Sequence, residues 1–330
     1  HSFPAGRSSD LARASIITGG NQGTNYPPPG SLVGGFFRRR IYYIPSTMNK
    51  QVYLDYHATT PVDPRVLDAM LPYLKDSFGN ASSKTHPYGW AAREAVEKAR
   101  SQVGSLLNAS PGEIYFTGGA TESNNISLLG AALHAPAERN HIITQSTEHH
   151  AVLDPLRKLE KDGWRLTVLN PDSEGFISAE ALGSALDERT FLVSIMAANN
   201  EVGTVQPLDE LGRAAAAAGA LLHCDAAQAA GKIRLDVESS AISMLSLSGH
   251  KFCAPKGVGA LYRRKRGNRV RLAPLALGGG QEEGLRAGTL QVPGRPEGGR
   301  EGKGGRLRGG PHSAKKKTAH PVRHPHLTTT

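Results

Sequence analysis

Hydrophobic residues along this 330-residue chain follow two alternating patterns, one typical of strands and one typical of helices. Between residues 90 and 107, apolar residues recur every three or four positions, which predicts an amphipathic helix. Another helix is expected to begin near Pro64, because proline is tolerated in the first turn of a helix. Further helices are predicted over 122–133, 151–161, 179–186 and 208–218. Short apolar runs predict strands over 114–116, 141–144, 166–169, 191–196, 220–223, 244–247 and 258–262.

Strands that alternate with helices indicate βα units, so we predict an α/β fold with a mostly parallel central sheet and helices on both faces. In such sheets, ligands bind beyond the carboxyl ends of the strands. Several predicted strands are followed by polar residues at this end, namely the segment 147–149, Asn200, Asp225 and Lys251. The sequence therefore predicts one ligand site along the rim formed by these strand ends.

The formal net charge of +10 comes from the two ends of the chain. Residues 1–50 hold six basic residues against one acidic residue, and 294–330 hold nine against two, which leaves a net charge of −2 between them. The basic excess therefore gives no reason to expect a nucleic-acid partner for the folded part. Apolar runs long enough to span a bilayer are also missing, so we expect no membrane partner.

Composition divides the chain into three parts. Residues 1–47 are rich in Gly, Pro, Ser and Asn and are predicted to be a disordered leader, while 48–293 form the patterned domain. Residues 294–330, dominated by Gly, Arg, Lys, His and Pro, are predicted to be a disordered basic tail. The leader is arginine-rich and nearly free of acidic residues, which suits an organellar transit peptide. Alternatively, Met48 is the physiological start and the preceding residues are not native.

Cysteine usage bears on the compartment. Cys224 and Cys253 are the two cysteines of the chain, so it is not a disulfide scaffold and a reducing compartment is expected. We therefore predict a cytoplasmic protein, or a mitochondrial one if residues 1–47 are a transit peptide. Both cysteines are expected to be small packing residues.

A lysine, an acid and a histidine at the ends of three predicted strands give the strongest chemical signal. Lys251, Asp225 and His149 are the residue types that pyridoxal 5'-phosphate needs. An amine condenses with the cofactor aldehyde, a carboxylate keeps the pyridine nitrogen protonated, and an imidazole stacks on the ring. A half-buried lysine should also have a lowered pKa. The sequence therefore predicts pyridoxal 5'-phosphate as cofactor, with Lys251 and His149 as catalytic residues.

The pair His149 and His150 also raises the possibility of a metal site. No further ligands at the spacing of a structural site accompany the pair, so a ring-stacking role is favoured for His149 and a surface position for His150. No metal site is predicted. Asn200 is expected to hydrogen-bond the cofactor or substrate, and Gln228 to reach the phenolic oxygen of the cofactor.

A phosphate site is predicted where the segment 118–124 follows a strand and opens a helix. Its glycines allow close approach of an anion, and the helix N-terminus offers free N–H groups. The alternative is an ordinary turn with Thr121 as the N-cap. The basic run 263–266 is expected to be solvated at a hairpin turn around 267–268 rather than to bind nucleic acid.

Over residues 52–293 the sequence resembles the cysteine desulfurases of iron–sulfur cluster assembly, a branch of the class V aminotransferases. The matching stretches are 53–61, 119–124, 147–149, 199–201, 225–228, 248–251 and 278–282. The resemblance implies the fold-type I architecture of pyridoxal phosphate enzymes and a homodimer. It also implies the removal of sulfur from L-cysteine, giving L-alanine and a persulfide that passes to a sulfur-acceptor scaffold protein.

The resemblance implies a role for each site residue. Lys251 would bind the cofactor covalently, His149 would stack on its ring, and Asp225 would pair with the pyridine nitrogen. Gln228 would contact the phenolic oxygen, and Asn200 would lie beside cofactor and substrate. The implied phosphate ligands are Thr121, Ser248, His250 and, reaching from the other subunit, Thr289.

The sequence departs from the family in its last part. There the family carries a loop cysteine that attacks the substrate sulfur and an arginine that binds the substrate carboxylate, and 294–330 matches neither. A frameshifted or mis-joined reading frame is the favoured explanation, and a truncated paralogue with another role is the alternative. Either one predicts a largely absent small C-terminal domain, exposed apolar surface and a chain that binds cofactor without completing the thiolate step.

Smaller departures and two rival functions complete the expectations. Gly118, Glu283 and Ala287 replace the usual Ser, Arg and Ser of the family. One rival is a selenocysteine lyase or another class V pyridoxal phosphate enzyme. The other is a non-catalytic dimer partner of a complete desulfurase.

Overall fold

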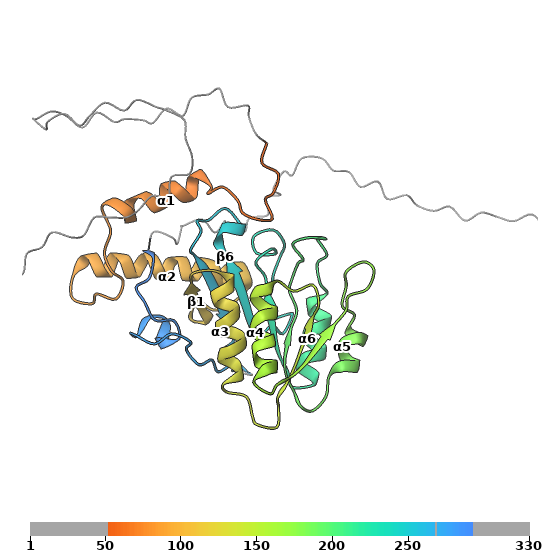
Figure 1. Ribbon diagram of the computed structural model, residues 1–330. Helices are drawn as coiled ribbons and strands as arrows, with labels where there is room; N and C mark the ends of the chain where they lie inside the picture. The colour runs from red at the N-terminus through yellow and green to blue at the C-terminus, as the bar shows by residue number, and fades with distance from the viewer. Residues whose placement is uncertain (1–51, 268, 293–330) are drawn as a thin grey trace, which may run out of the picture. The chain divides into compact units, whose positions relative to one another are not determined.

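Seven strands form one central sheet in the computed structural model, which describes residues 52–267 and 269–292 (Figure 1). From Tyr53 onward the described residues belong to one compact unit. The strands lie in the spatial order β1-β7-β6-β5-β4-β2-β3. Their bounds are Ile114–Thr117 (β1), His141–Gln145 (β2), Arg165–Leu169 (β3), Thr190–Ser194 (β4), Leu221–Asp225 (β5), Met244–Ser248 (β6) and Gly259–Arg263 (β7).

The sheet is parallel except at β7. The pairs β6–β5, β5–β4, β4–β2 and β2–β3 are all parallel, whereas β7 is antiparallel to both of its neighbours, β6 and β1. The short connection between β6 and β7 explains the reversal, because only antiparallel neighbours can be joined without a long crossover. The predicted mostly parallel sheet is confirmed.

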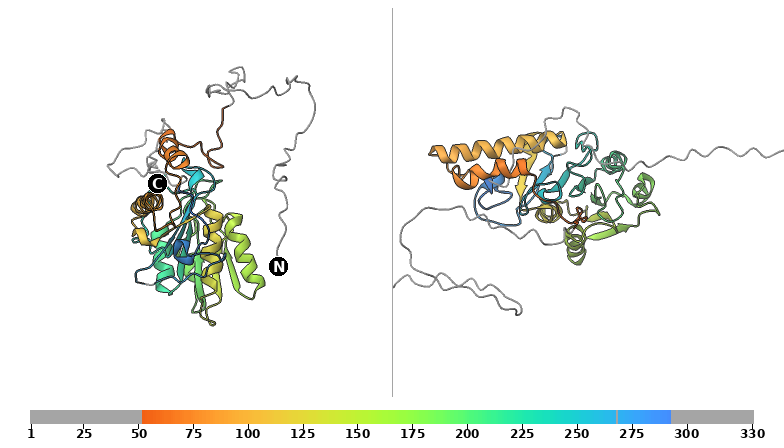
Figure 2. Two further views of the ribbon diagram at one scale, coloured as in Figure 1. Left: turned by 90° about the vertical axis from the view of Figure 1, so that its left-hand side faces the viewer. Right: turned by 90° about the horizontal axis from the view of Figure 1, so that it is seen from above.

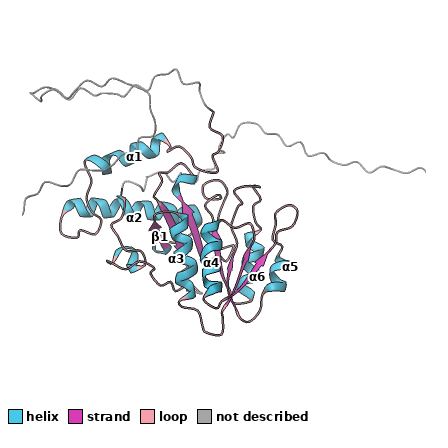
Figure 3. Cartoon of the chain, in the orientation of Figure 1, coloured by secondary structure: helices cyan, strands magenta, loops and turns pink. Residues whose placement is uncertain are grey.

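Helices cover both faces of the sheet (Figures 2 and 3). Apolar residues of α3 and α4 pack on one face, and apolar residues of α2, α5 and α6 pack on the other. The helices span Pro64–Lys75 (α1), Pro87–Leu107 (α2), Ala120–Ala132 (α3), His150–Lys161 (α4), Ala179–Ala185 (α5) and Leu208–Ala217 (α6). The short 3-10 helices are Pro111–Glu113 (η1), Gly249–Lys251 (η2) and Gln281–Gly284 (η3).

Neighbouring residues of each central strand enter the two opposite cores. Ile142 of β2 packs with α3 and α4, while Ile143 packs with the helices of the other face. Met244 and Leu245 of β6 divide in the same way. Because side chains alternate across a strand, a strand buried on both faces reads as a continuous apolar run. This is why short apolar runs located the strands, each within three residues of its observed ends.

Two expectations about individual residues are wrong. The basic run begins inside β7 and is only partly solvated: Arg266 is exposed, but Arg263 is buried, with its guanidinium 4.6 Å from the ring centre of Tyr115. The Arg264 guanidinium donates to the backbone oxygens of Val237 and Ile242. Cys253 is exposed rather than packed, because it follows η2 in a left-handed conformation with φ of 68°.

Large apolar side chains are exposed between residues 52 and 90. Helix α1 contributes no buried residue, and Leu67 and Leu74 on it are both exposed. Exposed apolar surface was expected, and the described part of the chain shows much of it here, with further exposed side chains such as Leu133, Val202 and Leu277 elsewhere. No helix among the described residues is long and apolar enough to cross a membrane.

Candidate functional site

The predicted site residues gather where four neighbouring parallel strands end. Asp225 is the last residue of β5, and Lys251 lies in η2 directly after β6. His149 follows β2 and caps the N-terminus of α4, and Asn200 lies in the turn after β4. Since β6, β5, β4 and β2 are consecutive in the sheet, their carboxyl ends bring these residues to one rim.

Asp225 is a buried carboxylate whose two oxygens each accept one hydrogen bond. Its Oδ2 accepts from Asn124 Nδ2 at 2.7 Å, and its Oδ1 accepts from the backbone N–H of Ala227 at 2.9 Å. Burial raises the pKa of Asp225, and the nearby His149 and Lys251 act against this rise. Among the described residues no cation forms an ion pair with it. Such a carboxylate suits a cationic ring nitrogen.

Lys251 follows β6, the strand that pairs with β5, which carries Asp225. Its Nζ donates to the backbone oxygen of His57 at 2.6 Å, and Gln228 Nε2 donates to the same oxygen at 2.9 Å. Burial lowers the pKa of Lys251, as expected from its position, while Asp225 and Asp55 oppose the change. A lysine with a lowered pKa holds more neutral amine at neutral pH, the form that condenses with an aldehyde.

The hydrogen bond at His149 decides which ring nitrogen carries its proton. Nδ1 accepts the backbone N–H of Ala151 at 3.0 Å as an N-cap of α4. In the neutral ring the proton is therefore on Nε2. His149 and His150 are both exposed, and His150 pairs with Asp154 at 3.5 Å. Among the described residues no group of His, Cys, Asp or Glu side chains is arranged to hold a metal ion.

A glycine turn and Ser248 form a narrow cradle at the N-terminus of α3. Gly119, with φ of 154°, is the N-cap residue, and a Cβ on it would lie 3.6 Å from Ser248 Oγ. Gly259 of β7 approaches so closely that a Cβ there would be 2.5 Å from the Cα of Gly119. Thr121 is not the N-cap, because it already lies in the first turn of α3, where its side chain is exposed. The cradle has the free N–H groups that a phosphate needs.

The segment after the first described residues covers the turn that holds Lys251. Thr60 donates from both its backbone N–H and its hydroxyl to the backbone oxygen of His250, each at 2.9 Å. The His250 Nδ1 lies 3.2 Å from Thr59 Oγ1, and burial lowers the pKa of His250. The 57–60 segment carried no expectation beyond the family resemblance. Its contacts join residues 190 or more positions apart along the chain, so no local pattern points to them.

The remaining predicted residues differ in their surroundings. Asn199, next to Asn200, is a turn former: its Oδ1 accepts from the backbone N–H groups of Glu201 and Val202. Asn200 itself is half-buried beside this turn. Thr289 is exposed, five residues after η3. Arg286 in the same segment forms an ion pair with Glu122 of α3 at 2.9 Å, which ties the segment to the helix that begins at the cradle.

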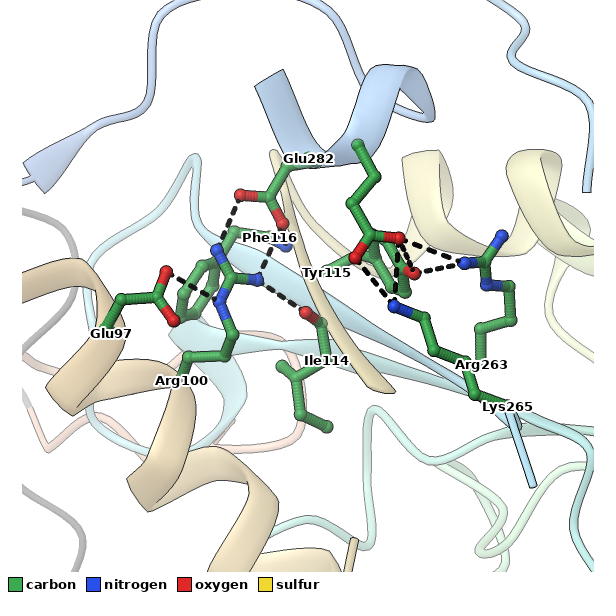
Figure 4. A network of polar contacts seen from close by, with 9 residues as sticks. Glu97, Arg100, Ile114, Tyr115, Phe116, Arg263, Lys265 and Glu282 are labelled. Carbon is green, nitrogen blue, oxygen red and sulfur yellow. Dashed lines mark hydrogen bonds and ion pairs between the residues drawn. The ribbon is translucent and has the colours of Figure 1, made fainter. Parts of the chain in front are cut away.

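A second polar network lies between α2, β1 and η3 (Figure 4). The Arg100 guanidinium donates to both carboxylate oxygens of Glu282, each at 2.9 Å, and also contacts Glu97. Glu283, at a position where the family usually has Arg, accepts from Tyr115 and Lys265. A cavity of about 560 Å³ adjoins this network, and none of its lining residues belongs to the predicted site. The network is therefore structural support for η3 rather than part of the rim.

Comparison with known proteins agrees with the resemblance in the sequence. Residues 52–298 match the family model described as aminotransferase class-V. A cysteine desulfurase IscS from Anaeromyxobacter sp. (strain Fw109-5) is 53% identical over 247 residues, covering 75% of this chain and 61% of that protein. A mitochondrial cysteine desulfurase from Drosophila melanogaster is 52% identical, covering 75% of this chain and 53% of that protein. The chain thus spans little more than half the length of these relatives.

Solved structures share the fold. A NifS-like protein superimposes with a TM-score of 0.71 at 45% identity, covering 74% of this chain and 66% of that one. A structure of SspA in complex with cysteine gives a TM-score of 0.70 at 45% identity, covering 73% and 69%. These similarities confirm the predicted α/β architecture of pyridoxal phosphate enzymes.

Proposed function

Because this chain belongs to the aminotransferase class V family of pyridoxal phosphate enzymes, we propose that it is the cofactor-binding part of a cysteine desulfurase. The observation that carries the proposal is the arrangement of Asp225, the last residue of β5, and Lys251, which lies directly after the adjacent parallel strand β6. A buried carboxylate without an ion-pair partner among the described residues lies at the same rim as a lysine of lowered pKa. Relatives about half identical to this chain are named cysteine desulfurases.

The residues of the rim fit pyridoxal 5'-phosphate group by group. We assign Lys251 to the aldehyde, Asp225 to the pyridine nitrogen and His149 to the ring face. Gln228 is assigned to the phenolic oxygen, and Asn200 to the side where substrate enters. The phosphate is assigned to the cradle, with Thr121, Ser248 and His250 around it, and Thr289 to the phosphate of a second subunit in a homodimer. When bound, the cofactor supplies an electron-withdrawing ring to the α-carbon of an amino acid.

Proton transfer in this proposal falls to Lys251. In its neutral form His149 carries its ring proton on Nε2, because Nδ1 accepts a backbone N–H, so its remaining polar group is a hydrogen-bond donor and not a base. With the cofactor bound at the rim, the Lys251 amine, whose pKa is lowered by burial, would be the group that takes up the substrate α-proton. Buried Cys224 does not serve as the thiolate, because burial and its acidic neighbours raise its pKa well above the usual range.

Substrate, partner and compartment are part of the same proposal. L-Cysteine is proposed as the substrate because desulfurases are relatives and a structure similar to this chain holds cysteine. A sulfur-acceptor scaffold and a homodimer stay predictions from the resemblance. Among the relatives are bacterial proteins as well as proteins named mitochondrial and mitosomal, so the cytoplasmic location and its mitochondrial alternative both stay predictions.

The test is a titration of the purified chain with pyridoxal phosphate, followed by the visible absorbance of the bound cofactor. We expect the band in the wild type and in Lys256→Ala, an exposed lysine beside the site, but not in Lys251→Ala. A band of equal strength in Lys251→Ala would refute the assignment of the lysine. Sulfide release on adding L-cysteine to the loaded wild type then tests the reaction separately from cofactor binding.

A further inference from the structure

Glu148 is a second buried acid at the candidate site, and none of the roles assigned above uses it. It lies between β2 and α4, directly before His149, and 6% of its surface is exposed. Oε1 accepts from Gln145 Nε2 at 2.9 Å and from the backbone N–H of Met196. Oε2 is buried and has no hydrogen-bond partner among the described residues.

The donors on Oε1 are fixed by a chain of amides. Gln206 Nε2 donates to Gln145 Oε1 at 3.4 Å, so Gln145 must turn its own Nε2 toward Glu148. Gln206 is held in turn by the backbone N–H of Ile177, which donates to its Oε1 at 2.9 Å. The side chain of Glu148 therefore cannot swing away to water without breaking this chain. Because these hydrogen bonds hold the Glu148 carboxyl in place, its buried surroundings determine whether it is protonated.

Glu148 and Asp225 bind adjacent residues of the segment that follows β4: the backbone N–H of Met196 donates to Glu148 Oε1, and that of Ala197 donates to the backbone oxygen of Asp225 at 2.9 Å. Repulsion from the Asp225 charge contributes to a raised pKa of Glu148. Two carboxylates that share a buried region do not both ionise at neutral pH, because their repulsion adds to the cost of burial. One of the two must hold a proton more tightly than a free acid would.

The contacts decide which acid is protonated. Asp225 has a hydrogen bond to each oxygen and feels the positive charges of His149 and Lys251. Glu148 has one bare oxygen, and among the described residues no cation acts on it; the titratable groups that face it are Asp225 and the thiol of Cys224, both from β5. Ionising Asp225 therefore costs less free energy than ionising Glu148.

We propose that Glu148 is a positioning residue that holds a proton at neutral pH, so that the single negative charge of the buried pair stays on Asp225 for the cofactor ring nitrogen. The role for the cofactor rests on the proposed function, but the protonation of Glu148 does not. Burial, with a smaller contribution from Asp225, raises the pKa of Glu148 to about 8, which agrees with this assignment.

The first experiment measures the unfolding of the apo chain in urea from pH 5 to pH 9 for wild type and Glu148→Gln. Glutamine keeps the oxygen that accepts from Gln145 and Met196. The acid holds its proton in the folded state up to about pH 8 and loses it near pH 4.5 when unfolded, so its contribution to stability falls as pH rises between these values. The folding equilibrium constant of wild type should therefore fall against that of Glu148→Gln, by up to about tenfold per pH unit.

Asp225→Asn is the matched comparison. If Asp225 held the proton instead, the growing gap with pH would appear between wild type and Asp225→Asn, while Glu148→Gln followed wild type in parallel. That result would overturn the proposal. If Asp225→Asn loses cofactor binding, and the gap in stability that grows with pH still appears between wild type and Glu148→Gln, both assignments are supported. Normal cofactor binding in that variant would refute the role of Asp225 while leaving the proton on Glu148.

A second measurement keeps the proposal testable if Glu148→Gln does not fold. Wild-type protein carrying ¹³C at the glutamate carboxyl carbons is titrated by NMR. We expect one glutamate signal to change near pH 8, far from the acidic range of the exposed glutamates. If every glutamate signal changes in the acidic range, Glu148 is ionised at neutral pH and the proposal is wrong.

Discussion

The ion pair between Arg100 and Glu282 gives the sharpest prediction about stability. The Glu282 side chain is fully buried, and Arg100 is 12% exposed. Besides its two bonds to Arg100, the Glu282 carboxylate accepts the backbone N–H of Phe116 at 2.7 Å. Glu282 and Glu283 both have positive φ, 49° and 57°, which ordinary side chains adopt only where contacts hold them. The pair therefore fixes a strained segment of η3 to the end of the sheet.

Replacing Glu282 with Gln should destabilise the chain by about 3 kcal/mol. Removing one partner of a buried pair leaves an uncompensated charge, which typically costs about 3–5 kcal/mol. Glu97 remains beside Arg100, with Oε1 at 3.2 Å from Nε, and lowers the cost toward the smaller value. In addition, the glutamine N–H₂ would face a guanidinium N–H, so one donor loses its acceptor.

Glu97→Gln is the matched control, because it removes a carboxylate from the same arginine. The Glu97 side chain is 56% exposed, and an exposed pair on a helix contributes only about 0.5 kcal/mol. Urea unfolding followed by circular dichroism gives both free energies, with the slope against urea as a check that the unfolded states are alike. Equal losses in the two variants, or a loss below about 1 kcal/mol in Glu282→Gln, would refute the argument from burial.

Two further predictions test the core. His223, fully buried between Ser194 and Ser246, has its pKa lowered by burial to about 3, so its contribution to stability is present above about pH 6.5 and is lost as pH falls toward 3. Wild type should therefore lose stability on acidification faster than His223→Gln, by up to about 1.4 kcal/mol per pH unit in denaturant titrations, and parallel curves would contradict this. Gly259→Ala should fail to form the phosphate cradle and lose several °C in melting temperature, since its Cβ meets backbone atoms at 2.5 and 2.6 Å. Gly183→Ala, in α5 with open space around it, should instead raise stability by about 0.5–1 kcal/mol, and similar losses in both variants would show that the clash is not the cause.

Local patterns predicted the elements well because most strands are buried on both faces; the edge strand β3 is the exception, with Arg165 and Val168 exposed. The strands β2 and β6 are fully buried and centred on apolar residues, Ile142 and Ile143 in β2 and Met244, Leu245 and Leu247 in β6. Helix α2 runs from Pro87 to Leu107, and the next residue, Asn108, has a φ of 55° that suits a helix C-cap. The spatial order of the strands could not be predicted in the same way. Nothing near β7 in the sequence indicates that it inserts between β1 and β6. That order depends on which apolar surfaces fit together across the whole sheet.

The site residues also fall into those that the sequence could predict and those that it could not. Lys251, Asp225 and His149 could be proposed from the sequence because each follows an apolar strand and carries distinctive chemistry. Asn124, which orients Asp225, could not: it looked like any polar residue in the first turns of a helix. Glu148 was equally hidden, because an acid between a threonine and a histidine suggests a surface turn. A buried acid of this kind is revealed by its surroundings, not by its neighbours in the chain.

The electrostatics of the rim depend on contacts between distant segments. Asn124 on Asp225 joins residues 101 positions apart, and Lys251 on the backbone of His57 joins residues 194 apart. Each of these contacts forms only when the sheet is complete, since β5 and β6 must pair before Asp225 and Lys251 share a rim. The pKa values of Asp225, Lys251 and Glu148 are therefore properties of the folded sheet, and partial unfolding returns all of them together to ordinary values. It follows that a variant that loosens β5 against β6 should weaken cofactor binding even when every residue assigned to the cofactor is unchanged.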